Sequence, residues 1–254
     1  MVFVEMILNS HLIRKNLATC LTCVHQPIIR LHFAAFVILT LATLFVQPVN
    51  AQLTNRTVLI MGDSLAAAYG IAKKDGWGYL LEDRLDDAYP GTDWQVINAS
   101  VSGETTAGGL RRLVPLLANN AVDVCVLALG ANDGLNGLPL TQMRSNLATM
   151  IDSCQAEGAR VVMLGIKLPP NYGNAYTAQF ESIYTDLVAE YQIPLEPFYL
   201  KDIIFRDGYM LEDRLHPSAI AQPVILETVW ETLKPVLDEV VDTKTAPLDQ
   251  AASR

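Results

Sequence analysis

The interpretation of this chain depends on the stretch VLIMGDSLAAAYG, residues 58–70, and on the role of Ser64 within it. Its first four residues form a continuous apolar run, which predicts a strand that is covered on both faces. Gly62 then permits a tight turn that a side chain would obstruct. Ser64 follows at the carboxyl end of the strand, the edge where open α/β sheets bind their ligands. Ser64 is therefore either the N-cap of a helix or a reactive group, and this stretch alone leaves both interpretations open.

Further apolar runs predict the rest of a sheet. They occupy residues 94–98, 122–129, 160–166 and, more weakly, 193–198, and longer amphipathic segments separate them. Strands that alternate with helices form parallel sheets, because each crossover returns the chain to the same edge. The pattern therefore predicts an α/β fold, with a five-stranded parallel sheet and helices on both of its faces.

The amphipathic segments predict helices. In the segment 141–158, apolar residues recur at helical spacing and a glycine closes the pattern: Met143, Leu147, Met150, Ile151 and Gly158. A last long helix is expected over residues 218–241, with Ser218 as its N-cap. The polar residues 242–254 are expected to form a disordered tail.

Composition and charge limit the function classes. The chain has 254 residues, of which 51% are hydrophobic and 18% charged, enough for one sizeable core. Its formal net charge is −9, and residues 1–51 hold three Lys/Arg and one Asp/Glu, so the remainder carries −11. This acidity argues against nucleic acids and anionic lipid surfaces as partners.

The pattern of residues at the amino end predicts a targeting segment. Arg30 and His32 precede the apolar stretch FAAFVILTLATLFV, residues 33–46, and QPVNA then ends at Ala51. A basic flank, a short apolar stretch and small residues at the exit predict a secretory signal peptide, cleaved near Ala51. The protein is then periplasmic or secreted, without a stable membrane span after processing. Fourteen apolar residues are short for a bilayer span, but an uncleaved amino-terminal anchor is the alternative.

The four cysteines suggest no metal or redox site. Cys20 and Cys23 have C-x-x-C spacing, but they lie in the leader and no second pair completes a site. Cys125 belongs to the apolar run VDVCVLALG and is expected to be buried, and Cys154 lies in a predicted helix. A disulfide between Cys125 and Cys154 is an alternative that an exported protein would permit.

Counting histidines gives the sharpest inference from composition. His11, His25 and His32 lie in the leader, so the body of the chain keeps only His216. A multi-histidine metal site is thereby excluded, and any Ser–His mechanism must use His216. Asp213 lies three residues earlier, where its carboxylate can hold one imidazole nitrogen and orient the other outward, as a general base requires. The alternative is a histidine at a helix start that a local carboxylate satisfies.

Two further strand ends carry groups that can stabilise an oxyanion. Gly103 follows the second apolar run, where its bare backbone N–H can approach a ligand. Asn132 follows the third run, and its side-chain amide can donate to a developing negative charge. Each alone is more typical of a turn. Together with Ser64 they place donors at three successive strand ends, and this coincidence favours a site. No G-x-S-x-G motif occurs, so the arrangement is not that of an α/β-hydrolase.

These motifs resemble the four blocks of the SGNH (GDSL) hydrolase family, in the family's order: GDSL, Gly103 within SGET, GAND, and DRLHP. The segments LPPNYG (168–173) and HPSAIAQP (216–223) are similar to the branch of thioesterase I, lysophospholipase L1 and the arylesterases. The resemblance extends over residues 57–240. One departure is Arg214-Leu215, because the family often has Gly within D-x-x-H.

The resemblance implies a fold and a set of roles. The fold is a flavodoxin-like, three-layer α/β/α hydrolase domain, expected over residues 52–241. Ser64 is implied as the nucleophile, His216 as the general base and Asp213 as its orienting carboxylate. The backbone N–H groups of Ser64 and Gly103 and the Asn132 side chain would form the oxyanion hole.

The same resemblance implies a cofactor-free, metal-free serine esterase, expected to be a monomer. It would hydrolyse carboxylic esters and thioesters, such as small acyl esters and lysophospholipids, through an acyl-enzyme. Leu168, Pro169 and Tyr172 are expected beside the acyl chain, although their loop could instead pack on its own domain. A carbohydrate O-deacetylase with the same site is one alternative, and a non-catalytic binding module is another.

Overall fold

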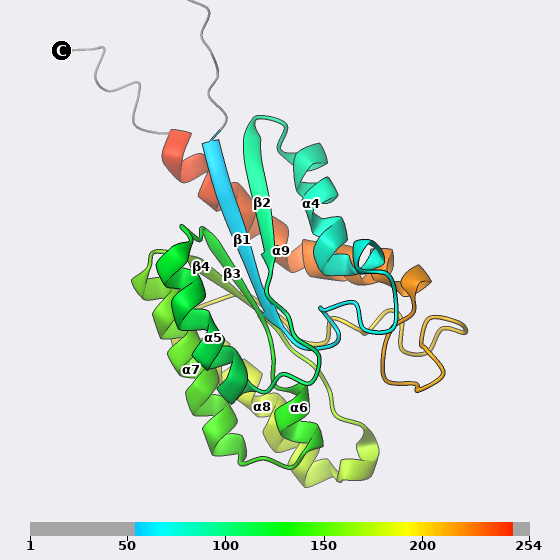
Figure 1. Cartoon of the computed structure of the whole chain (residues 1–254). Helices are drawn as coiled ribbons and strands as arrows, with labels where there is room; N and C mark the ends of the chain where they lie inside the picture. The colour runs from blue at the N-terminus through cyan, green and yellow to red at the C-terminus, as the bar shows by residue number, and fades with distance from the viewer. Residues whose placement is uncertain (1–53, 246–254) are drawn as a thin grey trace, which may run out of the picture. The chain divides into compact units, whose positions relative to one another are not determined.

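The computed structural model describes residues 54–245, which form a parallel sheet flanked by helices (Figure 1). The predicted leader, with Cys20, Cys23 and the cleavage near Ala51, lies outside the described residues. The strands are β1 (Thr54–Gly62), β2 (Thr92–Asn98), β3 (Val124–Ala128), β4 (Arg160–Leu164) and β5 (Leu195–Glu196). All are parallel, in the order β2-β1-β3-β4-β5. This is the flavodoxin-like order, and the predicted fold class is confirmed.

The central strands form the core of the sheet. Val58 in β1 lies opposite Val96 on one side and Val124 on the other. Every residue of β3 is buried, because helices cover both faces. Strand β5 has only two residues, although the apolar run around it predicted six. Pro194 and Pro197 flank it, and proline has no N–H to donate to a ladder.

The helices divide between the two faces of the sheet (Figure 1). Helices α5 (Thr106–Asn119), α7 (Leu140–Ala156) and α8 (Asn174–Tyr191) pack side by side, whereas α4 (Trp77–Ala88) packs against α9 (Gln222–Thr245). Shorter elements are α6 (Ala131–Leu135) and the 3-10 turns η2 (Lys73–Asp75), η3 (Pro170–Tyr172) and η4 (Ala219–Ala221). The short elements all lie in connections that leave the carboxyl ends of strands.

Helix α7 confirms its predicted face. Its apolar stripe is fully buried: Met143, Leu147, Met150 and Ile151. After its last turn, Gly158 adopts a φ of +81°, a left-handed conformation that a residue without Cβ adopts without strain. The N–H of Gly158 donates to the carbonyl of Gln155, which satisfies one of the free carbonyls at the end of the helix.

Helix α9 differs from the prediction at both ends. It begins at Gln222, after η4, and the Ser218 hydroxyl donates to the Gly208 carbonyl at 2.7 Å, so Ser218 does not cap it. The helix also continues past residue 241 to Thr245. Polar residues suit an exposed last turn, and between residue 241 and Pro247 no glycine or proline occurs to end the helix. The rest of the predicted tail, residues 246–254, lies outside the described residues.

Cys125 and Cys154 are both buried and are free thiols, so the alternative of a disulfide is not realised in the structure. The hydrogen bond with Cys154, together with burial, raises the pKa of the Cys125 thiol. Among residues 54–245, no helix is both long and apolar enough to cross a membrane.

Candidate active site

The carboxyl end of β1 is shaped by close packing around Gly62. A Cβ at this position would lie 2.8 Å from the Ala66 Cβ and from the Ser100 Oγ. Strand β1 runs through Gly62, and its φ is not positive. A side chain at this position would therefore be obstructed, as the sequence predicted, and glycine is required by the close approach of neighbouring atoms rather than by a positive φ.

No helix begins at Ser64, so the N-cap interpretation is wrong. Residues 64–70 form successive turns, and the first helical residues after them are those of η2. The capping group is instead Asp63: its Oδ1 accepts the N–H of Leu65 at 3.0 Å, and its carbonyl accepts those of Ala66 and Ala67. Asp63 thus satisfies this turn and leaves the Ser64 hydroxyl free for another partner.

That partner is His216. Its Nε2 lies 2.9 Å from the Ser64 Oγ, and its Nδ1 lies 2.7 Å from the Asp213 Oδ2. The other carboxylate oxygen, Oδ1, accepts the backbone N–H groups of Leu215 and His216. These hydrogen bonds to His216 and Leu215 lower the pKa of Asp213 to about 2. An ionised carboxylate only accepts, so Nδ1 is the donor in this pair, and Nε2 is the ring nitrogen that faces the hydroxyl.

The segment that carries His216 is fixed by its backbone and by one aromatic ring. The Leu211 N–H donates to the His216 carbonyl at 2.7 Å, and Met210 forms a bridge with Pro217. The Tyr69 ring packs against the imidazole at a tilt, with the ring centroids 4.3 Å apart and the planes inclined by 38°. Tyr69 belongs to the stretch 58–70 that also holds Ser64, but nothing in its local pattern predicted this contact.

Gly103 and Asn132 approach Ser64 from the next two strand ends. Gly103 has a φ of +78°, which disfavours any other residue, although a Cβ would meet no atom within 4 Å. The Asn132 Nδ2 donates to the Glu104 carbonyl at 3.0 Å and to the Asp63 Oδ2 at 3.4 Å. Within residues 54–245, the N–H groups of Ser64 and Gly103 donate to no protein acceptor. Two donors are thus free beside a side-chain amide.

Buried and half-buried polar groups that sequence reasoning missed hold this region. The Asp133 carboxylate accepts the N–H of Thr106 at 2.8 Å and its hydroxyl at 2.5 Å, which ties α6 to the first turn of α5. The Glu104 carboxylate pairs with Arg112 at 2.8 Å, and Arg112 also donates to the Ala99 carbonyl. Asp133 lies in GAND and Glu104 in SGET, so position within these two motifs was the signal that could have identified them.

Asp63 is the other group that the sequence did not single out. Its side chain is almost completely buried, and this burial raises the pKa of the carboxyl to about 6. Its two oxygens contact the turn that carries Ser64 and the Asn132 amide, so it joins the two halves of the site.

A cavity of about 580 Å³ contains Ser64, His216, Gly103 and Asn132 in its wall. Much of the remaining wall is apolar: Leu135, Ile166, Leu168, Pro169, Phe198 and Leu200. Leu168 and Pro169 therefore lie where the sequence predicted substrate contact.

Tyr172 is not part of this wall. Its hydroxyl donates to the Leu135 carbonyl at 3.0 Å, and its ring stacks against Tyr176. Of the three residues predicted beside the acyl chain, the structure thus brings two to the cavity. Tyr172 instead packs η3 against α6, because its hydroxyl finds a carbonyl there.

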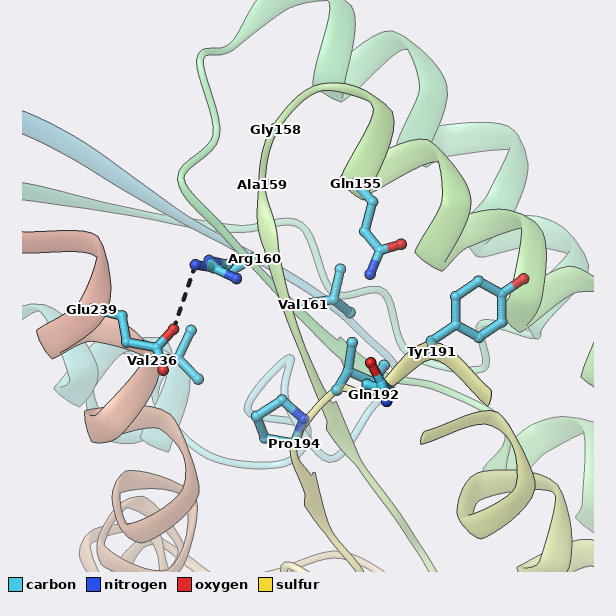
Figure 2. A pocket seen from close by; sticks show the side chains of 11 residues that line it. Gln155, Gly158, Ala159, Arg160, Val161, Tyr191, Gln192, Pro194, Val236 and Glu239 are labelled. Carbon is cyan, nitrogen blue, oxygen red and sulfur yellow. Dashed lines mark ion pairs between the residues drawn. The ribbon is translucent and has the colours of Figure 1, made fainter. Parts of the chain in front are cut away.

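A second cavity, of about 560 Å³, opens at the opposite edge of the sheet (Figure 2). Arg160, the first residue of β4, pairs there with Glu239 at 3.5 Å. None of the predicted site residues lines this cavity, and its wall has no serine, cysteine or histidine. In the part of the chain that the structure describes, no group of three His, Cys, Asp or Glu side chains could hold a metal ion.

Comparison with known proteins agrees with the motifs and the fold. Residues 60–222 match the model of the GDSL-like lipase/acylhydrolase family. Esterase TesA of Pseudomonas aeruginosa is 46% identical over 186 residues, which cover 73% of this chain and 92% of the relative. An arylesterase of Vibrio mimicus is 41% identical over 196 residues, 77% of this chain and 96% of the relative.

A third relative, thioesterase 1/protease 1/lysophospholipase L1 of Escherichia coli, is 35% identical over 186 residues, 72% of this chain and 85% of the relative. Among solved structures, the psychrotrophic esterase EstA from Pseudoalteromonas sp., inhibited by monoethylphosphonate, superimposes with a TM-score of 0.68. It is 39% identical, and the match covers 72% of this chain and 99% of EstA.

Proposed function

Because this chain belongs to the GDSL-like lipase/acylhydrolase family and is an ester hydrolase, we propose that Ser64 is its nucleophile, with His216 as general base and Asp213 as the carboxylate that orients His216. The hydrogen-bonded series from Asp213 through His216 to Ser64 carries this assignment. No other histidine in the body of the chain can act as the base, since His216 is the only histidine after residue 32.

The proposed reaction has two halves. His216 Nε2 takes the hydroxyl proton while the Ser64 Oγ attacks the carbonyl carbon of the ester. The protonated imidazole then donates to the leaving oxygen or sulfur, and an acyl-enzyme remains. Water, activated by the same nitrogen, attacks this ester and releases the acid. The ionised Asp213 stabilises the imidazolium in both halves and does not itself take the proton.

The tetrahedral oxygen is proposed to rest on three donors. The N–H groups of Ser64 and Gly103 are free for it, and the Asn132 amide lies in the same cavity wall. The bond from Asn132 to Asp63 is long, at 3.4 Å, so we expect this hydrogen to be the one that turns to the oxyanion. Fixed donors of this kind stabilise the charge that develops in the transition state without reorganising.

The substrates are proposed to be carboxylic esters and thioesters with an apolar acyl part. The cavity wall beside Ser64 is mainly aliphatic and aromatic, with Leu168 and Pro169 in it, which suits an acyl chain better than a sugar. The names of the relatives support the same range, from arylesterase to thioesterase and lysophospholipase. The carbohydrate deacetylase is thus disfavoured, and the binding module is disfavoured by the membership in a hydrolase family.

Export is part of the proposal. The basic flank, the apolar stretch 33–46 and the small residues up to Ala51 support a cleaved signal peptide and a periplasmic or secreted enzyme. Such a location would separate the enzyme from cytoplasmic acyl thioesters and leave lysophospholipids and small acyl or aryl esters as its usual substrates.

Kinetics of single and double variants test the proposed pair. Ser64→Ala and His216→Ala should each remove nearly all turnover of a p-nitrophenyl ester, and the double variant should lose little more. The reason is that the two side chains act as one unit, so removing either disables both. Additive losses in the rate would contradict the pair.

A further inference from the structure

Exposed apolar side chains gather at the edge of the sheet that holds the catalytic cavity. Four of them come from four different strand-to-helix connections: Tyr69 after β1, Val101 after β2, Leu138 after β3 and Tyr172 after β4. In a parallel sheet, all such connections leave the carboxyl edge of the strands, which is the lower end of the sheet in Figure 1. Ser64 lies at this same edge.

The fifth connection, from β5 to α9, carries four more. They are Ile204, Phe205, Leu215 and Ile220, and 93% of Phe205 and 61% of Ile220 are exposed. We call these eight side chains, four from each group, the apolar rim. Among the described residues, one other large hydrophobic side chain is exposed: Val114, within helix α5. An apolar surface of this kind, concentrated on one face, marks an interaction site.

Half of the apolar rim borders the cavity. Tyr69, Ile204, Phe205 and Leu215 are exposed and also belong to the cavity wall that contains Ser64. A partner that covers the rim therefore also covers the opening through which an acyl chain reaches the nucleophile. The chemistry of the partner should match that of the substrate, which is apolar at one end.

Charge on this face indicates which kind of surface fits. The segment 197–221, which provides half of the rim, holds three Lys/Arg and four Asp/Glu. Lys201 is paired with Glu196, and the Arg206 guanidinium lies over the Tyr209 ring. This near balance, on a chain of net charge −9, gives no attraction to an anionic bilayer and favours a surface without net charge.

We propose that the apolar rim docks the domain onto a zwitterionic lipid surface, so that an acyl chain passes into the cavity from the aggregate. Phe205 inserts among the lipid chains near the opening of the catalytic cavity, and the other rim residues contact the lipid surface around it. The proposal rests on the proposed function in one respect: the aggregate contains the substrate. Membrane-surface proteins commonly use exposed aromatic and aliphatic side chains in this way.

A tryptophan placed in the rim tests the proposal in the full chain. The three native tryptophans are all buried, so a Phe205→Trp variant adds one exposed indole. With phosphatidylcholine vesicles that contain brominated chains, its emission should shift to shorter wavelength and be quenched. Val114→Trp is the matched control at the exposed apolar position outside the rim, and its emission should change little. Quenching no greater in Phe205→Trp than in Val114→Trp would overturn the proposal.

Two more measurements test the rim against a protein partner and against an anionic membrane. A blue shift of Phe205→Trp that grows with protein concentration without lipid would mean that the rim binds a second copy of the chain, and would overturn the lipid assignment. Quenching as strong with brominated phosphatidylglycerol vesicles would overturn the preference for an uncharged surface. Hydrolysis of a monomeric p-nitrophenyl ester by the unaltered chain tests the proposed function separately, because quenching needs no catalysis.

Discussion

The Nε2 atom of His216 lies 2.9 Å from the Oγ atom of Ser64, although 152 positions separate the two residues in the chain. The first is held by the segment before α9, and the second by the turns after β1. Their approach follows from the parallel sheet, which brings all strand-to-helix connections to one edge. The proposed chemistry depends on this contact and on the groups that orient it.

Asp213 is the first of those groups. We expect Asp213→Ala to lower kcat by about 10³–10⁴, less than Ser64→Ala, because Asp213 orients and stabilises the imidazole but transfers no proton. Since the pKa of Asp213 is about 2, its protonation should contribute nothing to the loss of activity between pH 7 and pH 4. Single-turnover rates across this pH range check both statements. A loss in Asp213→Ala equal to that in Ser64→Ala would contradict the orienting role.

Asn132 should stabilise the transition state and should not strengthen the binding of the substrate. Removing one oxyanion donor costs about 2.7–4 kcal/mol, so Asn132→Ala should lower kcat by about 10²–10³ and leave KM nearly unchanged. Asn119→Ala, which removes an exposed amide from the end of α5, is the control and should match the unaltered enzyme. A large rise in KM at constant kcat would instead identify Asn132 as a ground-state contact.

Leu168 should determine how strongly kcat/KM depends on the length of the acyl chain. Burying one methylene contributes about 0.8 kcal/mol, so kcat/KM should rise from acetyl to hexanoyl or octanoyl p-nitrophenyl esters. Leu168→Ala should flatten this rise, because Leu168 lies in the cavity wall. Leu116→Ala removes the same atoms from α5, outside the cavity, and should retain the rise. A preference for acetyl esters in both variants and the unaltered enzyme would favour the deacetylase.

Asp63 should make stability depend on pH. Burial raises the pKa of this carboxyl from 3.8 to about 6, so between these values the folded state binds more protons than the unfolded state. The free energy of unfolding should therefore fall as the pH rises from about 4 to about 6, by about 3 kcal/mol from this group. Asp63→Asn removes the group, so its stability relative to the unaltered chain should increase over the same range.

Urea denaturation at a series of pH values measures the effect of Asp63. Asp93→Asn, which neutralises an exposed carboxylate on β2, serves as the control for the loss of one negative charge. If the difference between Asp63→Asn and the unaltered chain stays constant from pH 4 to pH 7, the raised pKa is wrong.

The sequence predicted the sheet and the main site residues because both depend on local patterns. Apolar runs locate buried strands, and the strand ends then bring Ser64, Gly103 and Asn132 to one edge whatever the side-chain detail. His216 could be singled out because the body of the chain has no other histidine.

What could not be predicted depends on contacts between distant segments. The burial of Asp63 and the contact between the Tyr69 and His216 rings arise from packing between segments that lie far apart in the sequence. Tyr172 lies outside the cavity wall because its hydroxyl donates to the Leu135 carbonyl. Ser218, an expected N-cap, donates its hydroxyl hydrogen to the Gly208 carbonyl instead. The sequence offers several possible hydrogen-bond partners for each of these polar side chains, and only the tertiary structure decides which one lies close enough.

Mass spectrometry of the intact protein after reaction with a fluorophosphonate tests the central claim most directly. A nucleophilic Ser64 activated by His216 should form one covalent phosphonyl adduct per chain, while esterase activity falls in proportion to labelling. Ser64→Ala should form none, and peptide mapping of the unaltered protein should locate the adduct on Ser64. An adduct on Ser64→Ala to the same extent, or complete labelling of Ser64 with activity retained, would contradict the assignment of Ser64 as the nucleophile.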